Sequence, residues 1–246
     1  SHGIIPAGQE VLMNTDRAIN WLLMVPLISI TLLLCHCQGP AAIDRSVAQQ
    51  PADWRPLFDG KTLTGWKGLV GNPYSRISMS PEQLAAAQIE ADRTMMAHWS
   101  VQDATLCFDG KGSHLCTSED FSDFILELEW KIEVGGDSGI YLRGCPQVQI
   151  WDPQQNPVGS GGLYNNQQAE SRPLVAADHP VGQWNRFRIT MIDKSVTVQM
   201  NDKLVVDRIP LENYWQRGSD IPRSGQIELQ SHGSRLWFRN IRIFEL

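Results

Sequence analysis

In the stretch FILELEWKIEV, residues 124–134, every second side chain is apolar, and those between them are charged except for Ile125. Its apolar members fall on one face of an extended chain: Phe124, Leu126, Leu128, Trp130, Ile132 and Val134. Successive side chains of a β-strand point to opposite faces, so a period of two indicates a strand. The stretch therefore predicts a sheet that is buried on one side and polar on the other.

Short apolar alternations separated by turn residues continue on both sides of this strand. Turns are expected at residues 109–112 (DGKG) and 135–139 (GGDSG), and a tight hairpin at Asn201-Asp202. The strands expected between turns are residues 99–103, 105–108, 114–117, 140–143, 148–151, 185–192, 195–200, 203–206, 226–230 and 236–244. This regular spacing predicts an all-β fold, a two-sheet sandwich or jelly roll.

One segment departs from the strand pattern. Ser80 offers a capping hydroxyl, Pro81 suits the first helical position, and Gln83 stands three residues after the cap. The strong helix formers that follow predict a helix over residues 81–96. Because this helix is inserted between the first strands, we expect it either to cover a sheet edge as a packing helix or to border a cleft as a lid.

The composition of the chain is that of an ordinary globular protein. Of its 246 residues, 42% are hydrophobic and 20% are charged, and the formal net charge is −6. These values exclude disordered, collagen-like and coiled-coil classes. The absence of a basic stripe argues against nucleic-acid binding through phosphate contacts.

Residues 1–48 are expected to precede the domain as an upstream extension and an export signal. Arg17 stands before an apolar run at residues 21–34, which is short for a membrane span and fits the core of an export signal. The small residues at 46–48 (SVA) resemble a cleavage site, which would leave a lead-in at residues 49–53 and a domain at residues 54–246. We expect an exported protein (periplasmic, extracellular or cell-surface) with no membrane span in the mature domain. A retained terminus, or one anchored by lipid at Cys35 or Cys37, is the alternative.

Three cysteines follow the expected cleavage site: Cys107, Cys116 and Cys145. An odd number permits one disulfide and one free thiol, and the pairing stays open. No CxxC motif or His/Cys cluster has zinc-ligand spacing. Calcium is conceivable at scattered aspartates, but no compact acidic loop supplies the six to eight oxygens that calcium takes. We therefore predict a site that needs no metal and no other cofactor.

The polar face of the strand at residues 124–134 carries four ionisable side chains: Glu127, Glu129, Lys131 and Glu133. Such a row is either a solvated sheet face or, as in sugar-active sandwiches, the place of catalytic carboxylates. Two carboxyls about 5–5.5 Å apart suit retaining hydrolysis, and a wider gap suits inversion. Both interpretations stay open, with Glu129 as a candidate catalytic acid and Lys131 as a candidate substrate-binding residue.

A second cluster lies in GDSGIYLRGCPQVQIWD, residues 136–152. Tyr141 and Arg143 are expected on one face of a strand, and Gln147, Gln149 and Trp151 on one face of the next. Planar amides, a guanidinium and an aromatic ring provide the hydrogen bonds and the stacking surface that sugars need. We predict that these five side chains bind substrate.

Two further groups are candidates for proton transfer. Asp152 ends the second of these strands, where it could act as a base, an acid or a calcium ligand, or could form an Asx turn before Pro153. His232 alternates with Glu228 and Gln230 on one face of IELQSHG, residues 227–233. A histidine titrates nearest neutrality, so we predict catalytic roles for His232 and Asp152, with Gln230 beside them as a substrate-binding residue.

Six blocks, in this order, carry a resemblance to a known family. They are LFDGKTLTGW (57–66), DFILELEW (123–130), GDSGIYLRG (136–144), GQWN (182–185), IELQSHG (227–233) and WFRNIRI (237–243). Together they resemble the 3-keto-disaccharide hydrolase domain, also described as a 3-keto-glucoside 1,2-lyase and 3-keto-2-hydroxy-glucal hydratase domain. The helix segment and residues 145–152 resemble its planctomycete branch. The resemblance covers about residues 54–246 and implies a concanavalin A-like lectin/glucanase sandwich, usually in exported bacterial proteins.

The activity that the resemblance implies is cleavage of a glycosidic bond in a 3-keto oligosaccharide or glycoside. A ketone at C3 acidifies the hydrogen on C2, so the group at C1 can leave by β-elimination, and water adds back for a net hydrolysis. Such chemistry needs a base at C2, donors at the ketone oxygen and an acid for the leaving group. We expect Asp152 or His232 as the base, Arg143 and Gln149 as the donors, and Glu129 as the acid.

The chain departs from the family pattern at one site position. Many relatives carry Glu-x-Gln-x-x-Asp where this chain has QVQIWD, residues 147–152, so Gln147 takes the place of a carboxylate. The loss of one candidate base leaves two alternatives open. One is a non-catalytic carbohydrate-binding or surface-adhesion module with tryptophan stacking plates, and the other is an ordinary retaining glycosidase.

Overall fold

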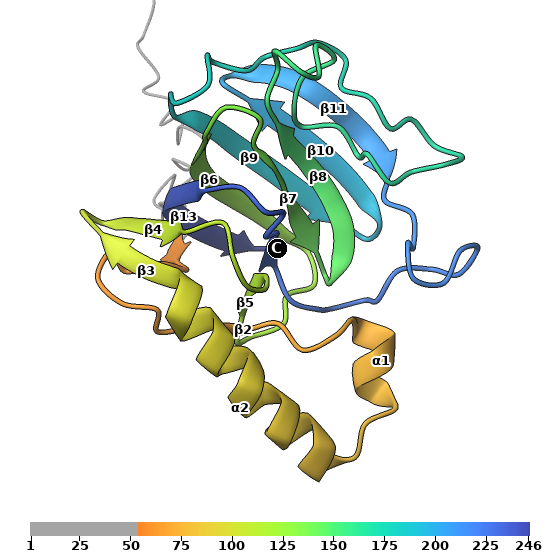
Figure 1. Cartoon of the computed structure of the whole chain (residues 1–246). Coiled ribbons are helices and arrows are strands. Elements are labelled where there is room, and N and C mark those ends of the chain that lie inside the picture. The colour runs from red at the N-terminus through yellow and green to blue at the C-terminus, as the bar shows by residue number, and fades with distance from the viewer. Residues whose placement is uncertain (1–53) are drawn as a thin grey trace, which may run out of the picture. The chain divides into compact units, whose positions relative to one another are not determined.

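The computed structural model describes residues 54–246. The expected export signal, its cleavage site, the two anchor cysteines and the lead-in at residues 49–53 lie outside the described residues and stay predictions. Within the described range the chain forms two antiparallel sheets, packed through their apolar faces, and two helices (Figure 1). The predicted two-sheet β-sandwich is confirmed.

The larger sheet, called the large sheet below, has eight strands in residues 54–246. Its order is β11 (Lys203–Pro210), β10 (Ser195–Met200), β9 (Asn185–Ile192), β6 (Phe124–Ile132), β13 (Leu236–Glu245), β4 (Thr105–Phe108) and β3 (Trp99–Gln102), and β1 (Arg55–Pro56) pairs with β13. The small sheet of the same part of the chain has five strands. Its order is β2 (Trp66–Gly68), β5 (Leu115–Thr117), β12 (Glu228–Leu229), β7 (Asp137–Leu142) and β8 (Cys145–Trp151).

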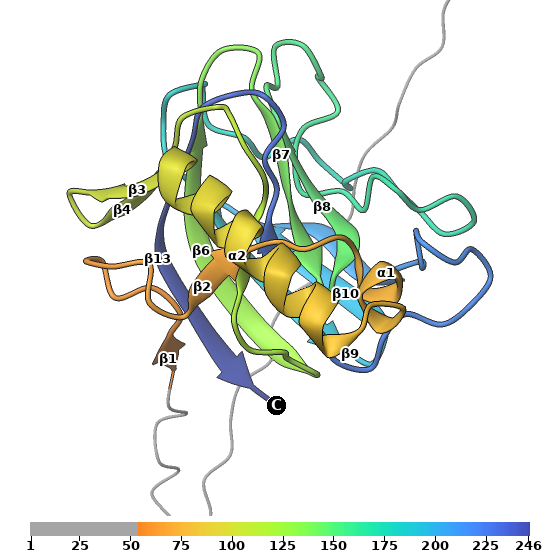
Figure 2. The same cartoon turned by 60° about the horizontal axis from the view of Figure 1, so that its bottom comes forward.

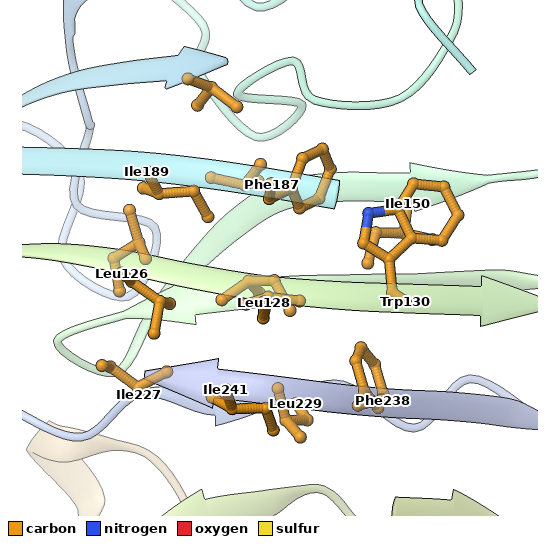
Figure 3. Close-up of a cluster of buried hydrophobic side chains, with 14 of the residues drawn as sticks. Leu126, Leu128, Trp130, Ile150, Phe187, Ile189, Ile227, Leu229, Phe238 and Ile241 are labelled. Atoms are coloured by element: carbon orange, nitrogen blue, oxygen red, sulfur yellow. The ribbon is translucent and has the colours of Figure 1, made fainter. Parts of the chain in front are cut away.

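The hydrophobic core lies between the two sheets. The apolar side chains of β6 point into it as the two-residue period predicts, and Leu126, Leu128 and Trp130 are almost completely buried (Figure 3). From the small sheet, Ile150 and Leu229 meet them. The inner faces are therefore closed, and polar side chains of both sheets collect on the two outer faces, which lie on opposite sides of the sandwich.

Helix α2 (Pro81–His98) confirms the predicted helix and extends it by two residues. The Ser80 side chain accepts a hydrogen bond from the Gln83 N–H, and the Gln83 side chain accepts one from the Ser80 N–H. The helix lies against β2 and β3, beside the sandwich (Figure 2). Its Asp92 Oδ1 accepts from the Gly68 N–H at 2.9 Å, and Gln88 Nε2 donates to the Gly68 carbonyl at 2.8 Å. α2 therefore covers the edge of the small sheet at β2, which was one of the two expected roles.

Helix α1 (Pro73–Ile77) was not predicted. Asn72 precedes it, and the Asn72 side chain accepts hydrogen bonds from the backbone N–H groups of Tyr74 and Ser75. Pro73 occupies the first helical position. A single turn has no apolar period, so the cap was its only signal in the sequence.

The thiols of Cys107, Cys116 and Cys145 are free, so no disulfide links these three residues. Among residues 54–246, no helix is long and apolar enough to cross a bilayer. Nor does any group of three or more His, Cys, Asp or Glu side chains in that part of the chain come together as metal ligands would.

Candidate functional site

The outer face of the small sheet carries a hollow of about 450 Å³, called the pocket below. Strands β7 and β8 supply its floor, and the segment after β12 and two loops supply the rest. The lining residues are Asp137, Tyr141, Pro146, Gln147, Gln149, Trp151, Asn156, Tyr164, Asn165, Tyr214, Trp215, Gln230 and His232. This is the volume of a typical small-molecule site.

Six side chains predicted from the sequence meet in this pocket. Strand β8 alternates as expected, so that Val148 and Ile150 enter the core while its polar side chains and Trp151 face outward. The six are Tyr141, Gln147, Gln149, Trp151, Gln230 and His232. Two strands that pair side by side, β7 and β8, and the segment that follows β12 bring them together.

A polar network runs across the pocket floor. Gln147 Nε2 donates to Gln149 Oε1, and Gln149 Nε2 donates to Asp137 Oδ1 at 2.7 Å. The other oxygen of that carboxylate, Oδ2, lies 3.5 Å from His232 Nδ1. A carboxylate beside Nδ1 orients the ring and leaves Nε2 to act on a substrate. Asp137 thus connects the buried amides to a half-exposed imidazole.

Aromatic rings form two walls of the pocket. Trp151 and Tyr164 meet edge to face with ring centroids 5.3 Å apart, and Tyr214 and Trp215 do so at 4.9 Å. Backbone carbonyls fix both indoles, because Trp151 Nε1 donates to Gly159 O and Trp215 Nε1 donates to Gly144 O. Rigid aromatic plates of this kind suit the C–H faces of sugar rings.

The glycine-rich loop at residues 159–162 places one of these walls. Gly161 N–H donates to Gln149 O at 2.8 Å, and Gln149 N–H donates to Gly162 O at 2.9 Å, so the loop lies along the outer edge of β8. At Gly161, where φ is +93°, a Cβ would lie 2.8 Å from Val205 Cγ2, so a side chain would not fit. Tyr164 and Asn165, which follow this loop, line the pocket.

His114 lies behind the pocket against Tyr141. Their rings meet edge to face at 5.2 Å, and the Nδ1 of His114 lies 3.1 Å from Ser231 Oγ. Burial, followed by the charge of His232, lowers the pKa of His114 to about 4. His114 is therefore neutral near pH 7 and supports the pocket instead of exchanging protons in it.

Arg143 does not share the face of Tyr141. It stands in the turn between β7 and β8 with φ +55°, followed by Gly144 with φ +73°, and the register between the strands shifts after Ile140. Its guanidinium is buried away from the pocket, where it donates to the Ser122 carbonyl and to the Asp123 carboxylate. The expected alternation fails here because the strand has already ended.

Asp152 also lies outside the pocket lining. It follows the outward-facing Trp151 and is 1% exposed. Its Oδ1 accepts from the Gln154 N–H and its Oδ2 from the Gly135 N–H, each at 2.8 Å. These contacts are those of the Asx turn, which was one of the interpretations given for Asp152.

Glu129 and Lys131 lie on the outer face of the large sheet, across the core from the pocket. Glu129 accepts from Arg239 Nε at 2.6 Å and from Asn240 Nδ2 at 3.0 Å. The ammonium of Lys131 lies over the rings of Trp184 and Trp237, 5.1 and 4.8 Å from their centroids. Neither can reach a substrate bound beside His232.

The face around Glu129 has a hollow of similar volume, about 450 Å³, which includes Glu127. Three arginines donate to the two oxygens of Glu127: Arg186, Arg188 and Arg242. The three guanidinium groups neutralise the Glu127 carboxylate and connect β6 to its neighbouring strands. We therefore place the candidate site on the small sheet.

Sequence analysis missed several residues of the pocket. Asp137 was not among the predicted site residues, although it starts β7 and the two-residue period puts it on the face of Tyr141. Tyr214 and Trp215 come from the long connection between β11 and β12, which has no periodic pattern. Only the density of aromatic residues could have indicated them.

Comparisons with known proteins agree with this assignment. A family model described as the 3-keto-alpha-glucoside-1,2-lyase-like domain matches residues 53–244. The chain is 26% identical over 260 residues to a 3-keto-disaccharide hydrolase of Bacteroides thetaiotaomicron, and the match covers 82% of each protein. These findings support a hydrolytic, sugar-cleaving enzyme.

Two solved structures of candidate glycosyl hydrolases from Parabacteroides distasonis are also similar. One is 29% identical with a TM-score of 0.59, and the match covers 80% of this chain and 85% of that one. The other is 25% identical with a TM-score of 0.54, and the match covers 79% of this chain and 100% of that one. Both agree with the sandwich described above. Because the family model spans most of its length, this chain belongs to the 3-keto-alpha-glucoside-1,2-lyase-like domain family.

Proposed function

We propose that the pocket cleaves the glycosidic bond of a 3-keto disaccharide or 3-keto glycoside by β-elimination followed by hydration. The observation that carries the proposal is the His232–Asp137–Gln149 network on the floor of a pocket with aromatic walls. An imidazole oriented by a carboxylate is suited to removing a carbon-bound proton. The family membership of the chain supports the same substrate class.

In the proposed reaction His232 removes the proton from C2 of the oxidised sugar. The C2 electrons form a C1=C2 double bond as the C1–O bond breaks, and the departing alkoxide takes up a proton. Water then adds at C1 and a proton returns to C2, so the products are the 3-keto monosaccharide and the released alcohol. Asp137 positions the imidazole and stabilises it while it is charged.

Tyr141 is the proposed donor to the ketone oxygen, on which negative charge collects during elimination. Its phenol oxygen accepts from Gln230 Nε2 at 3.4 Å, which leaves the phenol hydrogen for a ligand. The Gln149 amide donates to Asp137 and to two backbone carbonyls, Ser138 O and Ile150 O. We therefore assign to Gln149 the placement of Asp137, and to Tyr141 the donor role expected of Arg143.

Two observations bear on the alternatives. A retaining glycosidase requires two carboxyl groups about 5–5.5 Å apart, whereas the lining of the pocket contributes one carboxylate, that of Asp137. The aromatic walls formed by Trp151 and Trp215 would also suit a binding module. Turnover therefore has to be measured directly.

The test compares a 3-keto disaccharide, such as 3-keto-trehalose or 3-keto-sucrose, with its unoxidised parent. We expect residues 54–246 to release the monosaccharides from the 3-keto form alone. The His232→Gln variant should lower kcat by about 10²–10⁴-fold, because a positioned acid–base group contributes that much. Glu129→Gln is the matched control, a carboxylate removed from the opposite face, and should leave kcat within about twofold.

Binding of the 3-keto sugar without turnover, unaffected by His232→Gln but lost in Trp151→Ala, would instead favour the carbohydrate-binding module. Cleavage of unoxidised sugars at equal rates would favour an ordinary glycosidase. Export of the protein stays part of the proposal, supported by the apolar run at residues 21–34.

A further inference from the structure

Three outward side chains around β12 each have a buried oxygen for which residues 54–246 supply no hydrogen-bond donor. They are Gln226 Oε1, Glu228 Oε1 and Gln230 Oε1, two residues apart along one strand face. Gln230 lines the pocket, and Gln226 lines a second hollow of about 430 Å³ beside α1 and α2. Glu228 lies between the two, 1% exposed.

Glu228 is buried among groups that do not neutralise it. Its cross-strand neighbours are Cys116 on β5 and Tyr141 on β7. The charge of Glu228 raises the pKa of the Cys145 thiol at the start of β8, and the charge of Arg76 on α1 lowers the pKa of Glu228. Burial raises the pKa of Glu228 to about 8, against the opposing effect of Arg76.

The neighbouring groups do not titrate in the same range. Burial raises the pKa values of Cys116 and Cys145 to about 12, and Lys67, Arg76 and Asp92 contribute only smaller effects at Cys116. Burial, and after it the charge of Glu228, raises the pKa of Tyr141 above its ordinary value. Between about pH 7 and 10, Glu228 is therefore the group of this cluster whose charge changes.

Glu228 and Tyr141 are coupled through the sheet register. Directly opposite residues of an antiparallel pair have Cβ atoms about 4.5–5.5 Å apart, so their side chains are neighbours on one face. When the phenol donates a hydrogen bond to an enolate, negative charge builds up on the phenol oxygen, and a negative charge on Glu228 opposes that build-up. A neutral carboxyl removes that opposition.

We propose that Glu228 is a positioning residue of the pocket, whose neutral carboxyl allows Tyr141 to stabilise the enolate and whose ionisation weakens it. The proposal rests on the proposed function, since it assigns Tyr141 its role there. The residues on either side of Glu228, Gln226 and Gln230, line the two hollows.

The first test is the pH dependence of kcat with a 3-keto disaccharide, corrected for the uncatalysed rate. Wild-type kcat should fall several-fold between about pH 7 and 9.5. In Glu228→Gln, whose amide stays neutral, the ratio of kcat at the two pH values should be close to one. In Arg76→Gln the alkaline fall should move to higher pH, because Arg76 lowers the pKa of Glu228.

An alkaline fall that persists unchanged in Glu228→Gln would overturn the proposal. If Glu228→Gln does not fold, Arg76→Gln decides, and an alkaline fall that stays at the wild-type pH would overturn it. A purely structural role would change kcat or stability by the same factor at every pH and would not remove the pH dependence.

The second test does not need turnover. Because the folded-state pKa of Glu228 is raised, the folded protein holds a proton that the unfolded chain loses, and stability falls as pH rises from about 4.3 through about 8. As pH rises across this range, the melting temperature of Glu228→Gln should therefore increase relative to that of the wild type. A difference independent of pH overturns the inference. The expected gain without any 3-keto turnover would confirm that Glu228 is neutral in the folded protein, but would sink the proposed function and with it the role of Glu228 at Tyr141.

Discussion

At the scale of single residues, the account depends on the pairing of His232 with Asp137. The imidazole is 58% exposed on its side chain, so the protein holds it in place mainly through the carboxylate 3.5 Å from Nδ1. Asp137 in turn is held by Gln149 Nε2 at 2.7 Å. The orientation of the base thus depends on Asp137 of β7, Gln149 of β8 and His232 itself, which lies in the loop after β12.

Asp137→Asn should lower kcat by about 10²–10⁴-fold and change KM little. The amide is the same size but can present a donor to Nδ1, which favours the wrong tautomer of His232 and gives no stabilisation to the imidazolium. Steady-state kinetics on a 3-keto disaccharide measures this. A loss confined to KM would show that Asp137 binds sugar and does not position the base.

Single residues also show where sequence analysis succeeded and where it stopped. Gln147, Gln149 and Trp151 were predicted together because alternation along an unbroken strand fixes which side chains share a face. Arg143 was placed wrongly because alternation cannot indicate that a strand ends in a turn with positive φ. The candidate base Asp152 directly follows the outward-facing Trp151, so the two-residue period already places its side chain on the opposite side from the pocket.

At the scale of elements, strand β6 is the centre of the large sheet, and its outer face joins the neighbouring strands. Glu127 is 4% exposed, and its direct cross-strand neighbours are Arg188 on β9 and Arg242 on β13. Burial raises the pKa of Glu127, but hydrogen bonds to Arg242 and Arg188 outweigh it and leave the pKa below its ordinary value. Glu127 and Glu129, which were considered as possible catalytic carboxylates, therefore connect neighbouring strands through ion pairs.

Glu127→Gln should reduce the free energy of unfolding by about 1–3 kcal/mol at neutral pH, since three guanidinium groups lose a shared acceptor. A lowered pKa stabilises the fold above the ordinary glutamate pKa of about 4.3, and this contribution is lost as pH falls through the folded-state value. The difference between variant and wild type should therefore shrink in acid. Urea denaturation at several pH values measures it, and a difference that is constant with pH would contradict this account.

Elements with a periodic pattern or a long run of helix formers were predictable, and short or irregular ones were not. The helix at Pro81–His98 was indicated by Ser80, Pro81 and Gln83, and its contact with the β2 edge explains Gly68, whose Cβ would lie 2.1 Å from Ala91 O. By contrast, α1 is a helix of five residues with only a cap to indicate it, and the connection that contributes Tyr214 has no periodic pattern. Their positions follow from packing, which a single sequence does not encode locally.

At the scale of the whole domain, the two outer faces of the sandwich have different roles. On the large sheet, ion pairs satisfy Glu127 and Glu129. On the small sheet, acceptor oxygens of Glu228 and Gln230 are left without protein donors in the described part of the chain. Polar groups paired with one another on the large sheet stabilise the fold. Polar groups without protein partners on the small sheet are available to a ligand.

The central claim is that the small-sheet pocket breaks the glycosidic bond through loss of the C2 proton, and the most direct measurement is cleavage of a 3-keto disaccharide in D₂O. The released 3-keto monosaccharide should carry deuterium at C2, because elimination removes that hydrogen and hydration returns one from solvent. Mass spectrometry and NMR of the product, sampled before slow background exchange, locate the label. His232→Gln should suppress both cleavage and labelling, and Glu129→Gln should suppress neither. Cleavage that leaves the C2 hydrogen in place would contradict the account, because the bond would then break by direct displacement.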